Sequence, residues 1–455
     1  MNSLASKFPT LESEISNQLL NRLENRTAVI GVAGLGYVGL PLLASIAKAG
    51  YCAIGFDVDV SKIELINNGV SYIDAVKSEQ LAKHRQAEKI WATTDFSKFS
   101  DCDVICMCVP TPLTKQREPD LSFVENTTLA ISQHLAKGQL IVLESTTYPG
   151  TTDDVVKPIL ERSGLTSGIH FFIGYSPERE DPGNTSFDTA SIPKVVAGDG
   201  PIAKQLTDAF YSSIVKKTVP VSSVKTAEVV KITENVFRAV NIGLVNELKV
   251  IYDEMGIDIW EVIEAAKTKP FGFMPFYPGP GLGGHCIPVD PFYLTWKSRE
   301  FELPTRFIEL AGEINQAMPR YVIRKLEAAL DERLGLSLRN ASILIVGLAY
   351  KKNVADVRES PSLKLMELLD GRVVDLAFHD SYVTKIPSTR NHLNLCEKTS
   401  IGLTADSIAA YDALIIATDH DNIDFSLIAK HAKLIIDTRN ALRSRGCTAE
   451  WVVKS

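Results

Sequence analysis

A glycine-rich turn between an apolar strand and a helix constrains the fold of this chain more than any other feature. In VIGVAGLGYVGLP, Gly34, Gly36 and Gly39 form the pattern GxGxxG after an apolar run and before a helical pattern. In a dinucleotide-binding βαβ unit, the first glycine permits the tight turn and the second lets the backbone approach a pyrophosphate. The third permits close packing of helix on strand. The pattern predicts a Rossmann-type sheet whose first helix offers N–H groups to phosphates.

The residue that follows the next strand selects the cofactor. GFDVD ends a second apolar run with Asp57, about 20 residues after the glycines, where a carboxylate accepts hydrogen bonds from a ribose diol and repels a 2′-phosphate. NAD is therefore favoured over NADP, although Lys62 close by softens the preference. A glycine turn without a nucleotide is the alternative. Besides the glycines and Asp57, the expected cofactor contacts in this region are Leu35, Tyr37, Val38 and Lys62.

Charge limits the classes of partner. The chain has 48 Lys and Arg against 55 Asp and Glu, a net charge of −7. Nucleic acids and anionic membranes need a basic protein face, so neither is expected as a partner. A local basic pocket for a phosphorylated small molecule remains open. No metal site is expected either.

One uncharged stretch, residues 28–47, has the length of a membrane span, but its glycines and Pro41 favour a strand, a turn and a helix start. The N-terminus lacks a charged region followed by an apolar one, so no secretory signal is visible and a cytoplasmic location is expected. Leucines and an isoleucine at helical spacing predict a short amphipathic helix there: Leu11, Ile15, Leu19 and Leu23.

Strand-like and helix-like segments alternate in two parts of the chain, which predicts an α/β protein with two doubly wound parallel sheets. A long helical pattern, from about Ser223 to Met255, and an irregular Gly/Pro-rich segment, residues 269–291, lie between them. Such a long irregular segment is usually a functional loop. The expected divisions are an N-terminal extension, a cofactor domain, a central helical domain and a second Rossmann-like domain: 1–26, 27–215, 216–332 and 333–455.

Cys286 is the cysteine with a candidate chemical role, because it lies among glycines in GLGGHCIPVDP rather than in an apolar strand. Three of the seven cysteines, in CDVICMCV, are interpreted as small buried residues, since no paired His follows to complete a metal site. An odd number of scattered cysteines also argues against a disulfide framework and for a reducing compartment.

The central helix carries a second candidate pair. Lys231 and Asn235 are four residues apart and so share one helix face. They are either a solvated surface pair or a proton carrier and a hydrogen-bond donor near a reacting oxygen. Asp290, four residues after Cys286, is either a base or a structural partner.

Three further loops follow expected strand ends, where open α/β sheets bind ligands. They are VPTP with Thr111, ESTTYPGTT, and YSPEREDPGN with Glu178 and Arg179. The middle loop contributes Glu144, Thr146 and Thr147. The alternative for the threonines is that they cap the next helix.

In their order and spacing these motifs resemble the UDP-glucose/GDP-mannose dehydrogenase family. The resemblance extends from GLGYVGLP through SPER and GGHCIPVDP to AYKKNVADVRESP and DTRN. It implies an NAD-dependent enzyme that oxidises the C6 alcohol of a sugar nucleotide, with an N-terminal NAD domain, a central dimerisation helix and a C-terminal UDP domain. A homodimer or higher homo-oligomer is therefore expected.

Within the family, SPEREDPGN and the segment 269–291 look most like the members that oxidise UDP-N-acetylglucosamine for bacterial surface polysaccharides, including lipopolysaccharide O-antigen. The members that oxidise UDP-glucose more often read GFGGSCFPKD, whereas His285 and Pro288-Val289 stand here. An Arg that their substrate loop tends to carry is absent between Thr268 and Cys286. UDP-glucose, UDP-N-acetylmannosamine and UDP-N-acetylgalactosamine remain alternatives, because no motif reports a single stereocentre.

The resemblance also implies roles. The Cys286 thiolate adds to a C6 aldehyde, and the thiohemiacetal loses a second hydride to leave a thioester. Lys231 and Asn235 match groups that stabilise oxyanions or relay the alcohol proton, Asp290 a water-ordering carboxylate or base, and Glu178 a base for hydrolysis. Further contacts to cofactor are implied for Thr111, Thr146 and Arg358, and to substrate for Arg179, Lys231, Asn235, Tyr277, Gly283, Lys351 and Arg439.

Two rival functions are weaker. A two-electron 3-hydroxyacid-type dehydrogenase also pairs a Rossmann domain with a Lys/Asn helix, but it needs neither the GGHC loop nor a second sheet. A non-catalytic nucleotide-binding protein would not need Lys231, Asn235, Cys286 and Asp290 together.

Overall fold

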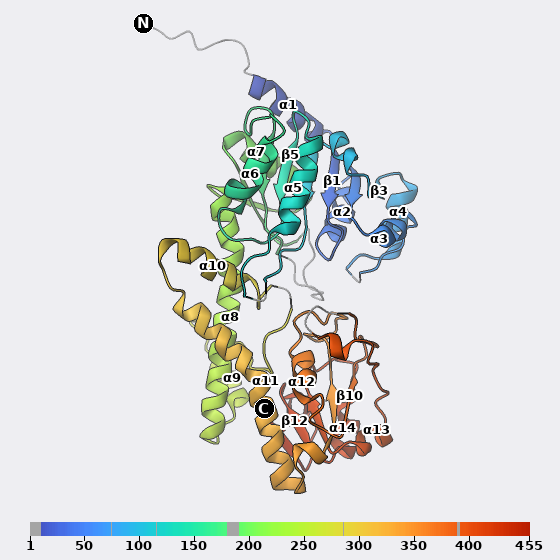
Figure 1. Ribbon diagram of the computed structural model, residues 1–455, viewed down its shortest axis with the longest axis vertical. Coiled ribbons are helices and arrows are strands. Elements are labelled where there is room, and N and C mark those ends of the chain that lie inside the picture. The colour runs from blue at the N-terminus through green and yellow to red at the C-terminus, as the bar shows by residue number, and fades with distance from the viewer. Residues whose placement is uncertain (1–10, 74, 115, 180–190, 285, 389–391) are drawn as a thin grey trace. The chain divides into compact units, whose positions relative to one another are not determined.

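The computed structural model describes residues 11–73, 75–114, 116–179, 191–284, 286–388 and 392–455 (Figure 1). Backbone contacts divide the chain into two units, Met1–Glu234 with Trp296–Phe301 and Asn235–Thr295 with Glu302–Ser455. Within the described residues, each unit contains one β-sheet. Among the described residues, no helix combines the length and apolarity needed to cross a membrane.

The first unit is built on an eight-stranded sheet with the order β3-β2-β1-β4-β5-β6-β7-β8. Every neighbouring pair is parallel except β6 and β7, which are antiparallel. The strands are β1 (Val29–Ala33), β2 (Cys52–Phe56), β3 (Ile90–Thr93), β4 (Val104–Met107), β5 (Leu140–Leu143), β6 (Phe172–Tyr175), β7 (Lys194–Gly198) and β8 (Thr218–Pro220).

Helices cover both faces of this sheet. The α-helices are α1 (Leu11–Glu24), α2 (Gly39–Lys48), α3 (Val60–Asn67), α4 (Ser78–Gln86), α5 (Ser122–His134), α6 (Lys157–Glu161) and α7 (Pro201–Ser212), with the short turns η1 (Phe96–Asp101) and η2 (Thr152–Val156). Successive side chains of a strand point to opposite faces. Accordingly, Ile30 packs in the core that contains side chains of α2 and α7, and Ala33 in the core that contains side chains of α5 and α6. The predicted doubly wound sheet and the N-terminal amphipathic helix are confirmed.

The long helix predicted from its apolar periodicity is confirmed as α8 (Val224–Glu254). Its residues up to Glu234 belong to the first unit and those from Asn235 onward to the second. The remaining helices are α9 (Ile259–Ala266), α10 (Asp290–Ser298), α11 (Arg306–Leu334), α12 (Pro361–Leu369), α13 (Ala405–Ala410), α14 (Phe425–His431) and α15 (Ala441–Ser444), with the 3₁₀ turns η3 (Arg299–Phe301), η4 (Leu338–Asn340) and η5 (Leu393–Leu395). Gly335 ends α11 in the left-handed conformation, where a glycine costs least.

A five-stranded parallel sheet organises the second unit, in the order β10-β9-β11-β12-β13. Its strands are β9 (Ser342–Val346), β10 (Asp375–His379), β11 (Ala413–Ile416), β12 (Ile435–Asp437) and β13 (Val452–Lys454). The strand order reverses between β1 and β4 in the first sheet and between β9 and β11 in the second. Open α/β sheets bind ligands beyond the carboxyl ends of the strands at such a reversal.

Candidate active site

The glycine turn of the first unit follows β1 directly. The Gly34 N–H donates to the Phe56 carbonyl at 2.8 Å, and its φ of +89° is a conformation that glycine adopts readily. A Cβ on Gly39 would lie 1.8 Å from the Gly34 oxygen, so only glycine fits there. A Cβ on Gly36 would meet nothing within 4 Å, which leaves open space beside the backbone at the start of α2. This cradle fits the pyrophosphate of a dinucleotide.

Asp57 lies at the end of β2 beside this turn. Its Oδ2 accepts hydrogen bonds from the Leu35 N–H at 2.9 Å and from Lys62 Nζ at 3.2 Å, and its Oδ1 accepts one from the Asp59 N–H at 3.0 Å. Two carboxylate oxygens accept about four hydrogen bonds, so capacity remains for a ribose hydroxyl. Of the other predicted loop contacts, Tyr37 is exposed and Val38 directly precedes α2.

The two threonine loops after β4 and β5 are tied to each other. Thr111 donates its hydroxyl hydrogen to the Thr146 carbonyl at 2.7 Å, and Ser145 donates to the Val109 carbonyl at 2.7 Å. Thr111 therefore links the two loops. Its hydroxyl donates to a loop carbonyl in this contact and does not cap the next helix, which was the alternative. The buried hydroxyl of Thr147 has no hydrogen-bond partner among the described residues.

A buried ion cluster that the sequence did not reveal lies behind the SPER loop. Lys194 Nζ is 2.8 Å from Glu144 Oε2 and 3.8 Å from Glu178 Oε2. Arg179 pairs with Glu234 and donates to the Pro193 carbonyl at 2.7 Å. The one available signal was a lysine at the start of the otherwise apolar strand KVVAG. Residues 180–190, the rest of the predicted loop, lie outside the described residues.

Lys231 and Asn235 are both buried on α8, with exposed fractions of 5% and 0%, so the alternative of a solvated surface pair is wrong. Asn235 donates from Nδ2 to Asp290 Oδ2 at 2.5 Å and accepts from Arg238. Asp290 is 2% exposed. A buried carboxylate needs such partners, and this one is joined directly to the predicted amide. The structure thus brings two of the predicted site residues, Asn235 and Asp290, together within the second unit.

Cys286 is partly exposed, and its carbonyl accepts hydrogen bonds from the Val289 N–H at 3.1 Å and the Asp290 N–H at 2.8 Å. This turn begins α10, so the chain itself fixes the thiol-bearing residue one helical turn from Asp290. A Cβ on Gly283 would lie 2.6 Å from the Tyr350 Cβ, and the Gly284 N–H donates to the Arg358 carbonyl at 3.0 Å. The glycines therefore allow the loop to pack closely on the segment after β9. His285 lies outside the described residues.

The other cysteines do not share this setting. None of the seven cysteines, all of them among the described residues, forms a disulfide, and burial raises the pKa of the Cys102, Cys106 and Cys108 thiols well above the usual range. A raised pKa keeps these three thiols protonated and unreactive. Among the described residues, no three His, Cys, Asp or Glu side chains are grouped so as to hold a metal ion.

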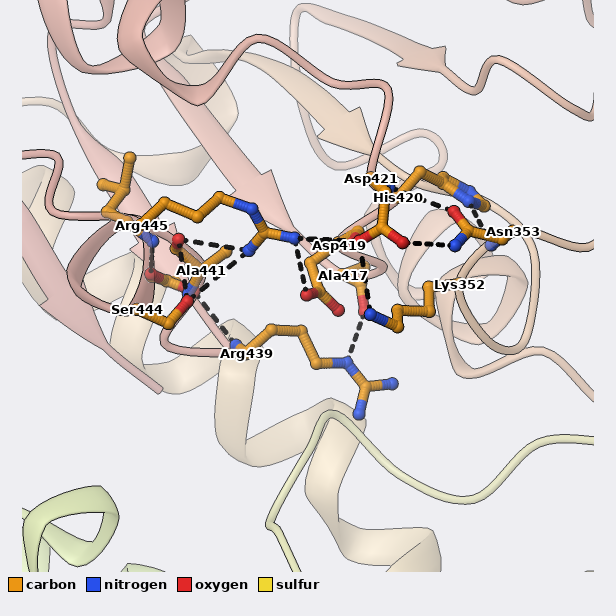
Figure 2. A network of polar contacts seen from close by, with 12 residues as sticks. Lys352, Asn353, Ala417, Asp419, His420, Asp421, Arg439, Ala441, Ser444 and Arg445 are labelled. Carbon is orange, nitrogen blue, oxygen red and sulfur yellow. Dashed lines mark hydrogen bonds and ion pairs between the residues drawn. The ribbon is translucent and has the colours of Figure 1, made fainter. Parts of the chain in front are cut away.

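A cavity of about 760 Å³ in the second unit contains two of the predicted substrate residues, Tyr277 and Arg439. The Tyr277 ring stacks on Trp260 at 5.7 Å between centroids and 16° between planes. Arg439 donates from Nε to the Ala417 carbonyl at 2.8 Å, whereas no described residue accepts a hydrogen bond from its two Nη atoms (Figure 2). The cavity therefore combines a stacked aromatic pair with a guanidinium group whose Nη donors have no acceptor among the described residues.

Sequence reasoning missed other groups that line this cavity, namely Trp260, Glu264, Lys352 and Arg443. Lys352 Nζ lies 3.2 Å from Asp421 Oδ1. This ion pair is drawn in Figure 2. Lys351, the predicted neighbour, is not among the lining residues. Arg358 forms a bidentate pair with Asp356, from Nε to Oδ1 at 3.0 Å and from Nη2 to Oδ2 at 2.6 Å, which holds its guanidinium two residues from Asp356 on the same segment.

The comparisons with known proteins cover both units. The NAD binding domain of the UDP-glucose/GDP-mannose dehydrogenase family matches residues 28–215, its central domain 225–317 and its UDP binding domain 344–444. The chain belongs to this family. Membership agrees with the glycine cradle, the Asn235–Asp290 pair and the cavity, and it makes the protein an NAD-dependent UDP-sugar dehydrogenase.

Individual relatives differ in their substrates. The UDP-N-acetyl-D-glucosamine 6-dehydrogenase of Pseudomonas aeruginosa is 36% identical over 86% of this chain and 90% of its own length. The UDP-N-acetyl-D-mannosamine dehydrogenase of Pyrococcus horikoshii is 34% identical over 91% and 96%. A solved structure of a UDP-D-ManNAc dehydrogenase from Pyrococcus horikoshii has a TM-score of 0.82 at 32% identity and covers 91% of this chain and 96% of that one.

Proposed function

We propose that this dehydrogenase oxidises the C6 hydroxyl of a UDP-N-acetylhexosamine, UDP-N-acetyl-D-glucosamine in the first place, to the uronic acid. Two relatives with that substrate in their names, at 36% and 34% identity, support the choice, as does the resemblance of SPEREDPGN and the segment 269–291. Relatives named for UDP-N-acetyl-D-mannosamine make that sugar the second candidate. A product of this kind would serve as a precursor of surface polysaccharides.

The observation that carries the four-electron reaction is the partly exposed Cys286, held by its own carbonyl at the start of α10 beside the buried Asn235–Asp290 pair. NAD supplies the hydride acceptor when it is bound at Gly34, Gly36 and Asp57. A two-electron alcohol dehydrogenase would have no use for a thiol in this place, whereas an aldehyde must be held covalently before its second oxidation.

The protein groups divide the chemistry as follows. Lys231 and Asn235 stabilise oxygen atoms that gain negative charge, and Lys231 or Asp290 takes the hydroxyl proton of the alcohol. The Cys286 thiolate forms a C–S bond to the aldehyde carbon. After the second hydride leaves, a water attacks the thioester carbonyl, Glu178 accepts a proton from that water, and the C–S bond breaks to return the thiolate.

The cavity of the second unit supports a UDP subsite. Its stacked pair of Trp260 and Tyr277 offers a surface for a base, because every base has a π-face. The cations Lys352, Arg439 and Arg443 suit a diphosphate. A guanidinium group can donate two parallel hydrogen bonds to phosphate oxygens, and a lysine adds a positive point charge. At about 760 Å³ the cavity has the size of a typical small-molecule site.

A homodimer through α8 is part of the proposal. Large apolar side chains recur along this helix at intervals of seven or eight residues and are exposed: Val229, Phe237, Leu244 and Ile251. Such a spacing places them in one stripe, and a contiguous exposed apolar stripe marks a protein interface. Light scattering of the purified chain measures the oligomeric state directly.

The proposed function is tested by the stoichiometry of NADH formation. UDP-N-acetylglucosamine, its galacto and manno epimers and UDP-glucose are supplied one at a time with excess NAD, and NADH absorbance is compared with substrate consumed. We expect two NADH per UDP-N-acetylglucosamine and the highest kcat/KM for that sugar. One NADH per sugar would exclude the four-electron mechanism. A higher kcat/KM for the manno epimer would make UDP-N-acetylmannosamine the substrate instead.

Substitution of the proposed nucleophile gives the second test. Cys286→Ser should abolish uronic acid formation, a loss of at least about 1,000-fold, because a serine hydroxyl is a weak nucleophile without an adjacent base. NAD binding, followed by calorimetry, should be unchanged. Cys396→Ser, at another partly exposed cysteine, serves as the matched control and should retain activity. Uronic acid production by Cys286→Ser at the normal rate would exclude a thioester.

A further inference from the structure

The antiparallel strand β7 brings a lysine next to the catalytic loop after β6. Tyr175 pairs with Ala197 and Gly174 with Gly198, so β7 begins where β6 ends. Lys194, the first residue of β7, therefore lies beside the segment 176–179, which carries Glu178. Its side chain is 7% exposed. A parallel neighbour would have placed its first residue at the opposite end of the sheet.

The Lys194 ammonium contacts two carboxylates and a carbonyl. Nζ lies 2.8 Å from Glu144 Oε2 and 3.8 Å from Glu178 Oε2, and it donates to the Pro177 carbonyl at 3.5 Å. Tyr211 donates its hydroxyl hydrogen to the other oxygen of Glu144, and its ring lies 5.0 Å from Nζ. Glu144 and Tyr211 thus anchor the cation, and the cation faces the loop of Glu178.

Electrostatic attraction to the two carboxylates holds the Lys194 ammonium in this position. A buried ammonium is costly unless it is paired, and here two carboxylates share it. Burial alone lowers the pKa of Lys194, but the negative charges of Glu144 and Glu178 raise it by more, so that the lysine stays protonated. The thiols of Cys106 and Cys108 also face this cluster, and burial raises their pKa values so that they stay neutral.

We propose that Lys194 is a positioning residue: anchored by Glu144 and Tyr211, it holds the Glu178 carboxylate and the Pro177 carbonyl in one orientation for the hydrolytic half of the reaction. The inference rests on the proposed function, because it assumes that Glu178 takes the proton of the attacking water. Lys194 itself forms no bond to substrate. Its removal should slow the hydrolysis of the thioester and leave both hydride transfers intact.

The experiment follows the thioester on the full-length protein. Glu178→Gln, Lys194→Met and Lys194→Arg are mixed with NAD and UDP-N-acetylglucosamine, and covalent adducts on Cys286 are measured by intact-protein mass spectrometry and peptide mapping. Lys194→Met should accumulate the acyl adduct as Glu178→Gln does. A burst of two NADH per subunit should precede a steady state slowed about 10- to 100-fold. This loss is smaller than the ~100- to 10,000-fold effect of a well-placed general base, because Glu178 is still present in Lys194→Met. Lys194→Arg should restore most of the rate.

The two proposals fail in different ways. If Glu178→Gln accumulates no adduct, the role of Glu178 in the proposed function is wrong. If Glu178→Gln accumulates the adduct and Lys194→Met does not, the inference on Lys194 is overturned. The double variant Glu178→Gln/Lys194→Met should hydrolyse no more slowly than Glu178→Gln, because a positioning residue acts through the group it positions.

Two further variants separate positioning from folding. Lys194→Met leaves Glu144 buried without its cation, so Glu144→Gln/Lys194→Met restores a neutral core and should still accumulate the adduct; a normal hydrolysis rate would contradict the inference. Lys249→Met is the matched control, since Lys249 is 2% exposed and its burial lowers its pKa to about 8. This substitution removes a buried lysine from the second unit. Whatever its effect on the melting temperature, the variant should not accumulate the acyl adduct.

Discussion

The two sheets begin with the same turn and use it differently. The Gly34 N–H donates to the Phe56 carbonyl at 2.8 Å with φ at +89°, and the Gly347 N–H donates to the His379 carbonyl at 2.8 Å with φ at +86°. In both cases an aspartate follows the second strand and accepts from the N–H after the glycine. The geometry of the first two residues is thus common to both turns, and it does not by itself make a nucleotide site.

The two turns differ from their third residue onward. After Gly34, open space surrounds Gly36 and α2 begins at Gly39. After Gly347, Ala349 is fully buried and its N–H donates to Asp380, and no α-helix begins before Pro361. The second turn therefore offers neither an open backbone nor a nearby helix N-terminus to a pyrophosphate.

The two aspartates show the same contrast. Asp57 accepts from the N–H groups of Leu35 and Asp59 and from Lys62. Asp380 accepts four backbone hydrogen bonds, from Leu348, Ala349, Tyr382 and Val383, and a fifth from His420 at 2.9 Å. A carboxylate saturated in this way has no capacity for a ribose. We infer that Asp57 binds the ligand, whereas Asp380 stabilises the fold.

The largest effect expected from this contrast is on stability. Asp380→Ala leaves four N–H groups, three of them in buried hydrogen bonds, and the buried His420 without their acceptor, so the free energy of unfolding should fall by about 3–5 kcal/mol. Asp57→Ala should cost no more than about 2 kcal/mol, because Asp57 has fewer protein donors. Urea unfolding of both variants measures the difference. Equal losses would show that the second aspartate is no more structural than the first.

A pH series sharpens the same point. Burial alone raises the pKa of Asp380, but the hydrogen bond and charge of His420 and the N–H groups of Leu348 and Ala349 lower it by more, to about 2. Its ordinary value is 3.8. Because the folded pKa is depressed, the stabilisation is present above pH 3.8 and is lost as the pH falls through about 2. It amounts to about 2 kcal/mol.

The variant Asp380→Asn isolates this contribution from all other acid-titrating groups. The difference in unfolding free energy between the original protein and Asp380→Asn should shrink by about 2 kcal/mol between pH 5 and pH 2. A difference that is constant over this range would mean that Asp380 keeps an ordinary pKa in the folded protein.

The sequence predicted the glycine turn after β1, the two sheets and the long helix well because short apolar runs and helical periodicity are local signals. It could not predict the cavity residues Trp260, Lys352 and Arg443, which come from distant segments and meet only after folding. The reversal of β7 was also hidden, since KVVAG has the same apolar pattern in either direction. Lys194 was missed for that reason.

Affinity for the cofactor gives the next prediction. Asp57→Ala should weaken NAD binding about 10- to 30-fold, because the ribose loses a charged acceptor, whereas binding to folded Asp380→Ala should change less than about twofold. Calorimetric titration of each variant with NAD measures both. Unchanged NAD affinity in Asp57→Ala would refute the assignment of the ribose to this carboxylate.

The smallest effect concerns the choice between NAD and NADP. Lys62 Nζ lies 3.2 Å from Asp57 Oδ2, so it offsets part of the negative charge that repels a 2′-phosphate. Lys62→Met should therefore raise the preference for NAD over NADP by about 2- to 5-fold, the range of a partly exposed ion pair. Lys352→Met, at the corresponding sheet edge of the second unit, should leave the ratio of the two affinities unchanged. A fall in the preference for NAD in Lys62→Met would show that Lys62 orients Asp57 for the ribose rather than neutralising it.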